Sequence, residues 1–317
     1  MYSSRRMLYP INIFIIFLLT TFPHINFAQN NVKIEIKNTP DRVKIKKIEN
    51  NLKKLTLILN NAYANDRKFS EKHASPLCSQ ECLDQLKCIW SLDSFKIETN
   101  DLTVNSYQIK PNLVELRTIP IIIKPRNNIN SIREHIMLCA NMKGKFTSLR
   151  FALEHQYVEK LMENMSQRAH AHHIIEFLEN FKTAYVMRDA SYLQTIIQSD
   201  ALILDGFENE GLNTENNITT RYLDYIKITK DQFLRKLQIG LFNQPDFIRV
   251  SFENIMIDSS MERDIYGLKI LQNLRVNNAH EENEVFVLMD VGTQDPIVEL
   301  RTLQSSPLCI KDNLRIQ

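Results

Sequence analysis

Hydrophobic and polar residues alternate at helical spacing in some segments of the chain and form short extended runs in others. Near the start, Ile45, Ile48, Leu52, Leu55 and Leu59 recur every 3.5 residues. Steps of three and four residues place side chains on one face of a helix, so the pattern predicts an amphipathic helix over residues 41–60. Two heptads are too few for a coiled coil, and we expect this helix to pack on a sheet.

A second short helix and a series of strands are predicted next. Ser79 is a suitable N-cap, and the helix after it would turn Cys82, Leu86 and Ile89 inward. Lys143-Gly144 supplies a turn between the last two strands. The extended segments are residues 95–99, 107–110, 113–124, 135–141 and 145–153. This half of the chain therefore predicts an α+β domain with an antiparallel sheet.

No glycine- or proline-rich linker follows the first half. Residues 154–187 contain no helix breaker, so a helical segment is expected to join the halves. A helical joint favours a fixed relation between domains over free swivelling.

The second half begins with helical periodicity and ends in strands. Ile174, Phe177, Leu178, Phe181 and Tyr185 share one helix face. Further signals are an N-cap at Asp189, a short strand at 201–204, a polar loop at 208–220, a capping box at Thr229 and Gln232, and strands at 248–258, 265–275, 285–291 and 297–304.

These motifs resemble the nuclear transport factor 2-like superfamily, in an uncharacterised group of exported bacterial proteins. The resemblance rests on residues 177–185, Arg188-Asp189, residues 199–203, Tyr266-Gly267-Leu268 with Gln272, residues 298–304, residues 119–122, and residues 144–146 with 151–153. It implies a cystatin-like α+β cone, in which three helices lie against a curved antiparallel sheet around an open pocket. It also implies that a smaller α+β domain with an antiparallel sheet precedes the cone.

The N-terminus predicts export. Arg5 and Arg6 precede an apolar run at residues 11–19, which is shorter than the roughly 20 residues that span a bilayer, and Ala28 is a small residue near its end. We therefore expect a protein of the periplasm or cell surface, with no integral membrane association once the signal is removed. The predicted division is 1–28 signal peptide, 29–153 N-terminal domain, 154–166 helical connector, 167–304 nuclear transport factor 2-like domain and 305–317 C-terminal tail.

Charge narrows the class of partner. The chain has 39 basic and 37 acidic residues, and removal of Arg5 and Arg6 leaves 37 of each. A neutral chain is a poor candidate for general nucleic-acid binding, which needs a basic face.

The five cysteines allow disulfides in an exported protein. The odd count leaves at least one thiol unpaired within the chain. We predict a Cys88–Cys139 disulfide because both residues border expected strands of the same half. Free buried thiols and a metal site are the alternatives.

One carboxylate is a candidate catalytic base. The steroid isomerase branch of the superfamily carries its base aspartate in an Asp-Ala-x-x-x-Asp pattern, and residues 200–205 match it and place Asp205 there. Phe181 stands where that branch has its oxyanion-stabilising tyrosine, and loss of such a donor costs about 10²–10³ in rate. The preferred interpretation of Asp205-Gly206 is a turn that ends a strand.

Other residues are candidates for ligand or metal binding. Phe181, Tyr185, Glu299 and Arg301 are candidates to line the pocket, although a core tyrosine and a solvated cross-strand pair are the preferred interpretations of Tyr185 and of Glu299 with Arg301. His170, His173 and Glu176 lie within two helical turns, a spacing that suits a metal, although a solvated helix end is preferred and neither metal nor cofactor is expected.

The function that these patterns favour is an exported, non-catalytic module. Its pocket would take a small apolar ligand or a protein partner, and its sheet would allow a homodimer. The alternative is an isomerase- or dehydratase-type enzyme that uses Asp205.

Overall fold

The computed structural model describes residues 32–38, 42–98, 101–126, 130–165, 168–213, 218–244, 247–259, 264–276, 279–292 and 297–305. Residues 33–317 belong to one compact unit. The predicted signal peptide, Cys309 and most of the predicted C-terminal tail lie outside the described residues.

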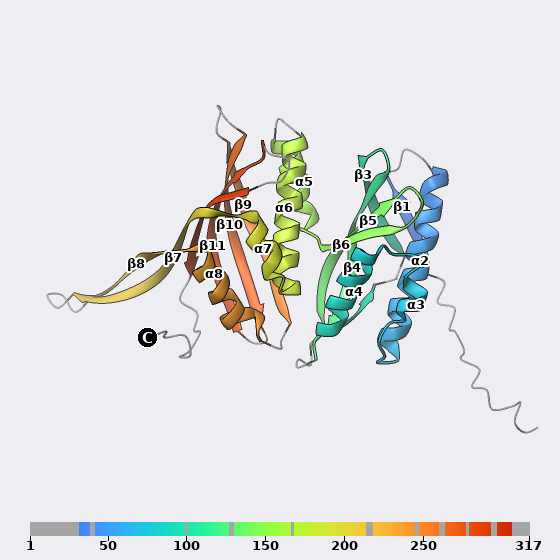
Figure 1. Ribbon diagram of the computed structural model, residues 1–317, viewed down its shortest axis with the longest axis horizontal. Coiled ribbons are helices and arrows are strands. Elements are labelled where there is room, and N and C mark those ends of the chain that lie inside the picture. Colours follow the sequence, from blue (N-terminus) through green and yellow to red (C-terminus); the bar gives the residue numbers. More distant parts are fainter. Residues whose placement is uncertain are drawn as a thin grey trace, which may run out of the picture. The chain divides into compact units, whose positions relative to one another are not determined.

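The first half of the chain folds around a mixed sheet, here called sheet A (Figure 1). Its strands are β1 (Ile34–Lys37), β2 (Ser94–Ile97), β3 (Leu102–Lys110), β4 (Leu113–Lys124), β5 (Ile132–Asn141) and β6 (Phe146–Phe151). The order is β1-β3-β4-β5-β6, and β2 also pairs with β4. The prediction of a purely antiparallel sheet is wrong, because the unpredicted strand β1 pairs with β3 in parallel.

Helices α2 (Arg42–Ala64), α3 (Glu71–Ala74) and α4 (Gln80–Leu92) accompany this sheet. The predicted helical stripe is confirmed, because Ile48, Leu52 and Leu59 are fully buried in α2. Ser79 caps α4 as predicted, since its hydroxyl accepts a 3.2 Å hydrogen bond from the Cys82 amide. Burial of these apolar faces against the sheet provides most of the driving force for folding this half.

Strand β4 carries a bulge that changes which side chains face the helices. Val114 and Leu116 are buried before it, and Ile119 and Ile121 are buried after it, so the alternation shifts by one residue. The register breaks between Leu116 and Ile119. Thr118 adopts a φ of 61°, a left-handed conformation that is uncommon for a β-branched residue.

The second half begins with helices and ends in a second mixed sheet, sheet B (Figure 1). The helices are α5 (His155–Asn164), α6 (Arg168–Met187), α7 (Ala190–Ile196), α8 (Lys230–Leu237) and the π-helix η2 (Gln238–Phe242). The strands are β7 (Ile197–Asn213), β8 (Ile218–Ile228), β9 (Ile248–Ser259), β10 (Ile265–Val276), β11 (Ala279–Asp290) and β12 (Ile297–Ser305), in the order β8-β7-β12-β11-β10-β9.

Two predictions for this half are corrected. Within the predicted polar loop at 208–220, residues 208–213 belong to β7 and residues 218–220 to β8, and the two strands pair antiparallel. Sheet B is not purely antiparallel either, since β12 pairs with β7 in parallel. Composition misled the prediction because ladder hydrogen bonds come from the backbone and tolerate polar side chains.

The capping signals that the sequence carries are confirmed. The Asp189 side chain accepts a 3.0 Å hydrogen bond from the Tyr192 amide at the start of α7. Thr229 and Gln232 form the predicted capping box of α8. These bonds satisfy amides that a helix leaves without partners at its first turn.

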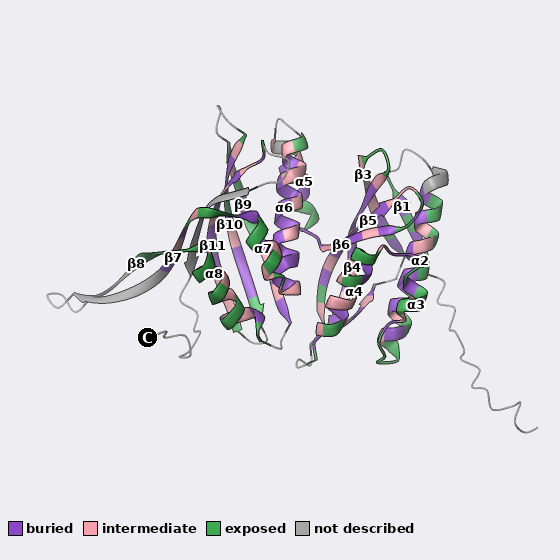
Figure 2. Cartoon of the chain, viewed as in Figure 1, coloured by how far each residue is buried: buried purple, intermediate pink, exposed green. Residues whose placement is uncertain are grey.

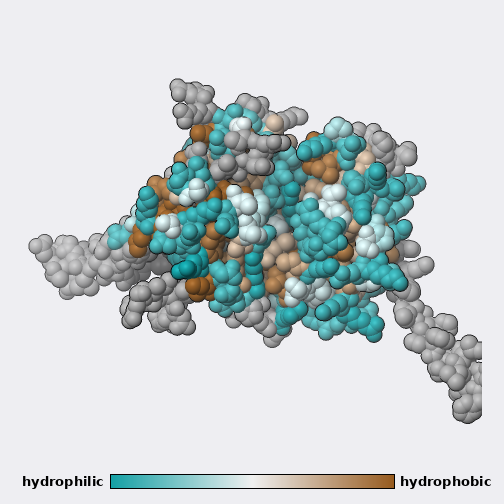
Figure 3. All heavy atoms as spheres, in the orientation of Figure 1, coloured by the Kyte–Doolittle hydropathy of each residue, from teal (hydrophilic) through white to brown (hydrophobic). Residues whose placement is uncertain are grey.

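Burial is concentrated where α6 and the two sheets lie together, and Figure 2 shows buried residues along much of that helix. Large hydrophobic side chains that stay exposed include Leu202, Tyr225, Ile226, Ile239 and Met256, all from elements of the second half. Hydrophobic surface is also visible around these elements in Figure 3. Among the described helices, none is long and apolar enough to cross a membrane.

Candidate functional site

A cleft of about 1510 Å³ lies between the β3–β4 ribbon and helices α5, α6 and α7. Polar side chains that line it include Tyr107, Glu115, Arg117, His172, His173, Glu176, Asn180 and Tyr192. Apolar side chains that line it include Ile109, Val158, Met162 and Ile196. Ligand sites usually combine apolar side chains with convergent polar groups, and this cleft has both, although polar residues form most of its lining.

The floor of the cleft holds a buried ionic cluster. Arg117 on β4 donates from Nη1 to Glu179 Oε1 of α6 at 2.6 Å, and its Nε and Nη2 reach Glu115 Oε2 at 2.8 and 2.6 Å. The side chains of Arg117, Glu179 and Glu115 are 5%, 0% and 2% exposed, respectively. Charges this deeply buried are tolerated only because they are paired and hydrogen-bonded.

Burial and pairing pull the ionisation of these groups in opposite directions. Burial disfavours charge on Arg117, but the neighbouring Glu179 and Glu115 outweigh it and raise the pKa of the guanidinium. Burial also raises the pKa of the Glu179 carboxyl, which Arg117 and the Leu153 amide only partly offset. Arg117 is therefore a permanent cation held between two carboxyl groups.

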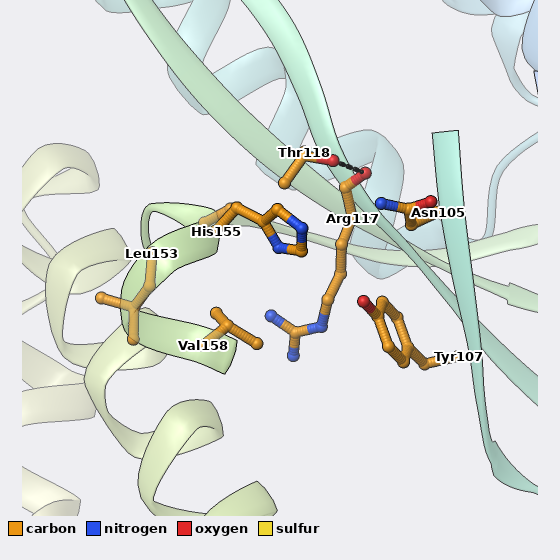
Figure 4. A pocket seen from close by; sticks show the side chains of 8 residues that line it. Asn105, Tyr107, Arg117, Thr118, Leu153, His155 and Val158 are labelled. Atoms are coloured by element: carbon orange, nitrogen blue, oxygen red, sulfur yellow. Dashed lines mark hydrogen bonds between the residues drawn. The ribbon is translucent and has the colours of Figure 1, made fainter. Parts of the chain in front are cut away.

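The alternation of side chains along β4, before its bulge, explains why Arg117 lies here. Glu115 and Arg117 are on the face of sheet A opposite Val114 and Leu116, and so point away from the helices α2 and α4. Figure 4 shows Arg117 reaching toward α5, with the Tyr107 ring on one side and Val158 and His155 on the other. A small cavity of about 10 Å³ lies beside it.

A second ion pair forms the wall of the cleft. Arg150 on β6 donates from Nη2 to Glu176 Oε1 on α6 at 2.7 Å. Burial acts to raise the pKa of Glu176, but Arg150 outweighs it, and the pKa lies below its ordinary value. Burial also raises the pKa of the neighbouring Tyr192 hydroxyl to about 12. At neutral pH the wall therefore presents the Glu176 carboxylate and the neutral Tyr192 hydroxyl.

A third ionic cluster ties α6 to both sheets. Glu134 on β5 accepts from Lys182 Nζ of α6 at 3.1 Å and from Arg249 Nε of β9 at 2.5 Å. Lys182 also donates to the Ala152 carbonyl at 3.1 Å. This cluster fixes the cleft walls, because one carboxylate bridges sheet A, α6 and sheet B.

The aromatic residues expected to line a pocket are packed in the core. Phe181 is 5% exposed and Tyr185 1% exposed. The Phe181 ring centroid lies 4.9 Å from that of Tyr185 and 5.9 Å from that of Phe252 on β9. These rings lie on the side of α6 that faces sheet B.

The remaining pocket candidates lie on strands. Asp205 is inside β7, paired with β8 and β12, and its carboxylate forms an ion pair with Lys236 of α8. The preferred prediction of a strand-ending turn at Asp205 is therefore wrong. Glu299 and Arg301 lie in β12, and their side chains are outside the described residues.

The histidines are split between the two sides of α6. His170 Nδ1 lies 2.7 Å from the Tyr266 hydroxyl on β10, whereas His173 and Glu176 line the cleft. Within the part of the chain that is described, no group of three His, Cys, Asp or Glu side chains is arranged to hold a metal ion.

The predicted disulfide between Cys88 and Cys139 is not formed. Both are free thiols, as are Cys78 and Cys82. The Cys88 thiol donates to the Met187 carbonyl of α6 at 3.7 Å, and the Cys139 thiol lies 3.7 Å from the Met137 sulfur. The two cysteines lie in different environments because α4 packs toward α6, while β5 is in the middle of sheet A.

Sequence reasoning missed the residues of the cleft floor. A signal was present, because Glu115 and Arg117 alternate with Val114 and Leu116 in an otherwise apolar strand. Alternation predicts that the two charges share a face. It does not identify Glu179, 62 residues from Arg117, as the partner.

Comparison with known proteins finds similarity among solved structures only. No family model matches the chain, and no curated protein matches it. A solved nuclear transport factor 2-like protein of unknown function from Shewanella baltica is 12% identical, with 45% of this chain and 99% of that chain covered and a TM-score of 0.31. A cystatin-like protein of unknown function from Nostoc punctiforme is 14% identical, with 43% and 90% covered and a TM-score of 0.31.

Enzyme-related structures are found at the same level. A putative scytalone dehydratase from Novosphingobium aromaticivorans is 11% identical, with 44% of this chain and 87% of that chain covered and a TM-score of 0.33. Identities and scores this low carry no conclusion about activity or site residues. The chain is α+β with mixed sheets, and at low identity and partial coverage its similarity is to proteins of the nuclear transport factor 2-like superfamily.

Proposed function

We propose that this protein is an exported, non-catalytic binding module whose ligand occupies the cleft between β3–β4 and α5–α7. The observation that carries the proposal is the cleft itself, with its volume of about 1510 Å³ and a lining that mixes apolar and polar side chains. Ligand pockets typically enclose about 300–1,000 Å³, so the cleft has room for a small molecule with an apolar part.

The location differs from the one that the superfamily resemblance implies. Phe181 and Tyr185 pack against each other, and Phe181 also packs against Phe252 of sheet B. The side of α6 that faces sheet B is therefore part of the core. The opposite side of α6 carries His173, Glu176 and Asn180 into the cleft. A helix that is apolar on one side and polar on the other separates a packed core from a binding surface.

The enzyme alternative receives less support from the same geometry. Asp205 is paired with Lys236, and the buried carboxyl groups Glu115 and Glu179 are paired with Arg117. A general base needs access to a proton of its substrate. Carboxylates engaged in ion pairs fit a structural or binding role better.

The experiment is native mass spectrometry of the protein purified from its own source. We expect a retained small molecule, and we expect Ile109→Trp to abolish retention because the indole would occupy the cleft. Ile239→Trp is the matched control, since Ile239 is 49% exposed on η2. Loss of the molecule in both variants, or in neither, would place the ligand elsewhere and contradict the proposal.

Two further parts of the proposal concern setting and partners. Export rests on residues 1–28, and N-terminal sequencing of the native protein tests it through cleavage near Ala28. A homodimer through sheet B rests on the exposed hydrophobic side chains Tyr225, Ile226 and Met256. Sedimentation at several concentrations tests the dimer, and a concentration-independent monomer contradicts it.

A further inference from the structure

We propose that the ligand of this cleft carries a protonated amine, bound by the carboxylates of Glu115 and Glu176, with its apolar part against Ile109, Val158 and Met162. The inference rests on the proposed function, because it uses the same cleft. It adds the chemical class of the ligand, which neither the resemblance nor the comparisons assign.

The first argument is the arrangement of hydrogen bonds on the two carboxylates. Both bonds from Arg117 to Glu115 end on Oε2, at 2.8 and 2.6 Å. Arg150 likewise reaches Glu176 only at Oε1, at 2.7 Å. Among the described residues, no donor contacts Glu115 Oε1 or Glu176 Oε2, and both side chains line the cleft. Each carboxylate therefore keeps one acceptor oxygen for a ligand.

The second argument is the charge balance of the two ion-paired clusters beside the cleft. Three carboxyl groups (Glu115, Glu176 and Glu179) lie together with two guanidinium groups (Arg117 and Arg150). Lys110 also lines the cleft, but it is exposed to solvent and salt, which screen its charge. With all three carboxyl groups ionised, these groups carry one surplus negative charge, and the 38% exposed Glu176 side chain presents it to a ligand cation.

A third observation points to a missing partner at the same place. His173 Nδ1 is buried and has no hydrogen-bond partner among the described residues, and its ring lines the cleft. A primary ammonium has three N–H donors, which is enough to donate to the unoccupied oxygens of Glu115 and Glu176 and to a ring nitrogen. Hydrogen bonds between ionised groups are shorter and stronger than neutral ones.

An anionic ligand fits this environment poorly. It would meet the unoccupied carboxylate oxygens of Glu115 and Glu176, and the Arg117 guanidinium already donates to Glu115 and Glu179. Nη1 of Arg150 is buried without a hydrogen-bond partner, but Arg150 is not among the residues that line the cleft. A proton on Glu179 would also remove the surplus charge, and in that case the cleft would show no preference for an amine. A preference for an amine over a neutral ligand of the same length therefore distinguishes an ionised Glu179 from a protonated one.

The test uses three probes of equal chain length, hexylamine, hexanol and hexanoate, titrated against the full-length protein at pH 7 by ligand-observed NMR. We expect the protonated amine to bind at least tenfold more tightly than hexanol, and hexanoate to bind most weakly. Glu115→Gln should reduce the affinity for the amine to that for hexanol while leaving hexanol binding unchanged. Glu163→Gln, at an exposed position of α5, is the control and should change neither.

The outcomes separate this inference from the proposed function. Equal affinity for hexylamine and hexanol in the native protein overturns the amine preference and leaves the cleft as the binding site. Failure of all three probes to bind overturns both. Since Glu115 is buried, Glu176→Gln provides a second variant at a more exposed position, and an amine preference that survives both folded variants contradicts the inference.

Discussion

At the residue scale, buried charge is the main feature that distinguishes this chain. Arg117, Glu115, Glu179, Glu134 and Lys182 are each less than one-tenth exposed. A buried ion pair is weak evidence for stability as such, because desolvation offsets much of the attraction. Its consequence is specificity: removing one partner leaves an uncompensated charge, so the arrangement around the cleft tolerates little change.

Arg117→Met is expected to lower the free energy of unfolding by about 3–5 kcal/mol, because Glu115 and Glu179 would remain buried without a cation. Chemical denaturation at pH 7 measures the change. Arg133→Met is the matched control, since Arg133 is 65% exposed in its pair with Glu98 and should contribute less than about 1 kcal/mol. If Arg117→Met lost no more stability than Arg133→Met, the charge of Arg117 would contribute little. Its role would then be packing of the aliphatic stem, which methionine largely preserves.

The Glu176 carboxyl should contribute a pH dependence of stability. Its pKa is lowered in the folded protein, so its contribution is present above the ordinary value of 4.5 and is lost as pH falls through the lower, folded value. Glu176→Gln should therefore unfold with less dependence on pH below 4.5 than the native chain. Thermal melts of the native protein and the variant, at pH values about one unit apart between roughly pH 3 and pH 7, check this. The same dependence of the melting midpoint on pH in both proteins would contradict it.

At the element scale, α6 replaces a neighbouring strand at the edge of sheet A. Strand β6 ends that sheet, and an uncovered edge leaves backbone groups without partners. Thr183 Oγ1 accepts from the Phe151 amide at 2.8 Å, Glu179 accepts from the Leu153 amide at 3.0 Å, and Lys182 donates to the Ala152 carbonyl. Side chains of α6 thus supply hydrogen bonds to the backbone of residues 151–153 that a neighbouring strand would otherwise supply.

Thr183→Val tests that role with little change in volume. The variant should lose about 1–3 kcal/mol of folding free energy, because the buried Phe151 amide would lose its acceptor. Thr195→Val on α7 is the control, since its exposed hydroxyl only bonds the Tyr192 carbonyl. Faster hydrogen exchange at the Phe151 amide should accompany the loss, and unchanged exchange would argue against the assigned bond.

At the scale of the whole molecule, the two sheets are coupled through α6. Glu134 bridges Lys182 of that helix and Arg249 of sheet B, and residues 33–317 form one compact unit. The domain boundaries at 153 and 167 stay predictions. The coupling nevertheless predicts that both sheets unfold in one cooperative transition.

Calorimetry of the native protein should therefore show a single transition. Glu134→Leu should lower its midpoint strongly, because Lys182 would be left buried without a counter-charge. Glu284→Leu, which removes an exposed pair with Lys269, should change the midpoint little. Two resolved transitions in the native protein would show that the sheets unfold independently.

Much of the fold could be predicted because its signals are local. The stripe from Ile45 to Leu59, the cap at Ser79, the cap at Asp189 and the capping box at Thr229 depend on residues a few positions apart. Strands β4, β9 and β10 were predicted because apolar alternation marks a buried face. Strands β1 and β8 were missed, since a strand of four residues and a polar strand carry little such signal.

The sequence by itself determined most of the helices, their caps and the apolar faces that form the core, because each follows from neighbouring residues. Only the tertiary structure decided that Phe181 and Tyr185 are core, that Cys88 and Cys139 lie apart, and that Glu115, Arg117 and Glu179 meet at a cleft. Those contacts join residues up to 62 positions apart across β4 and α6, and no local pattern records which charge will face which once the chain is folded.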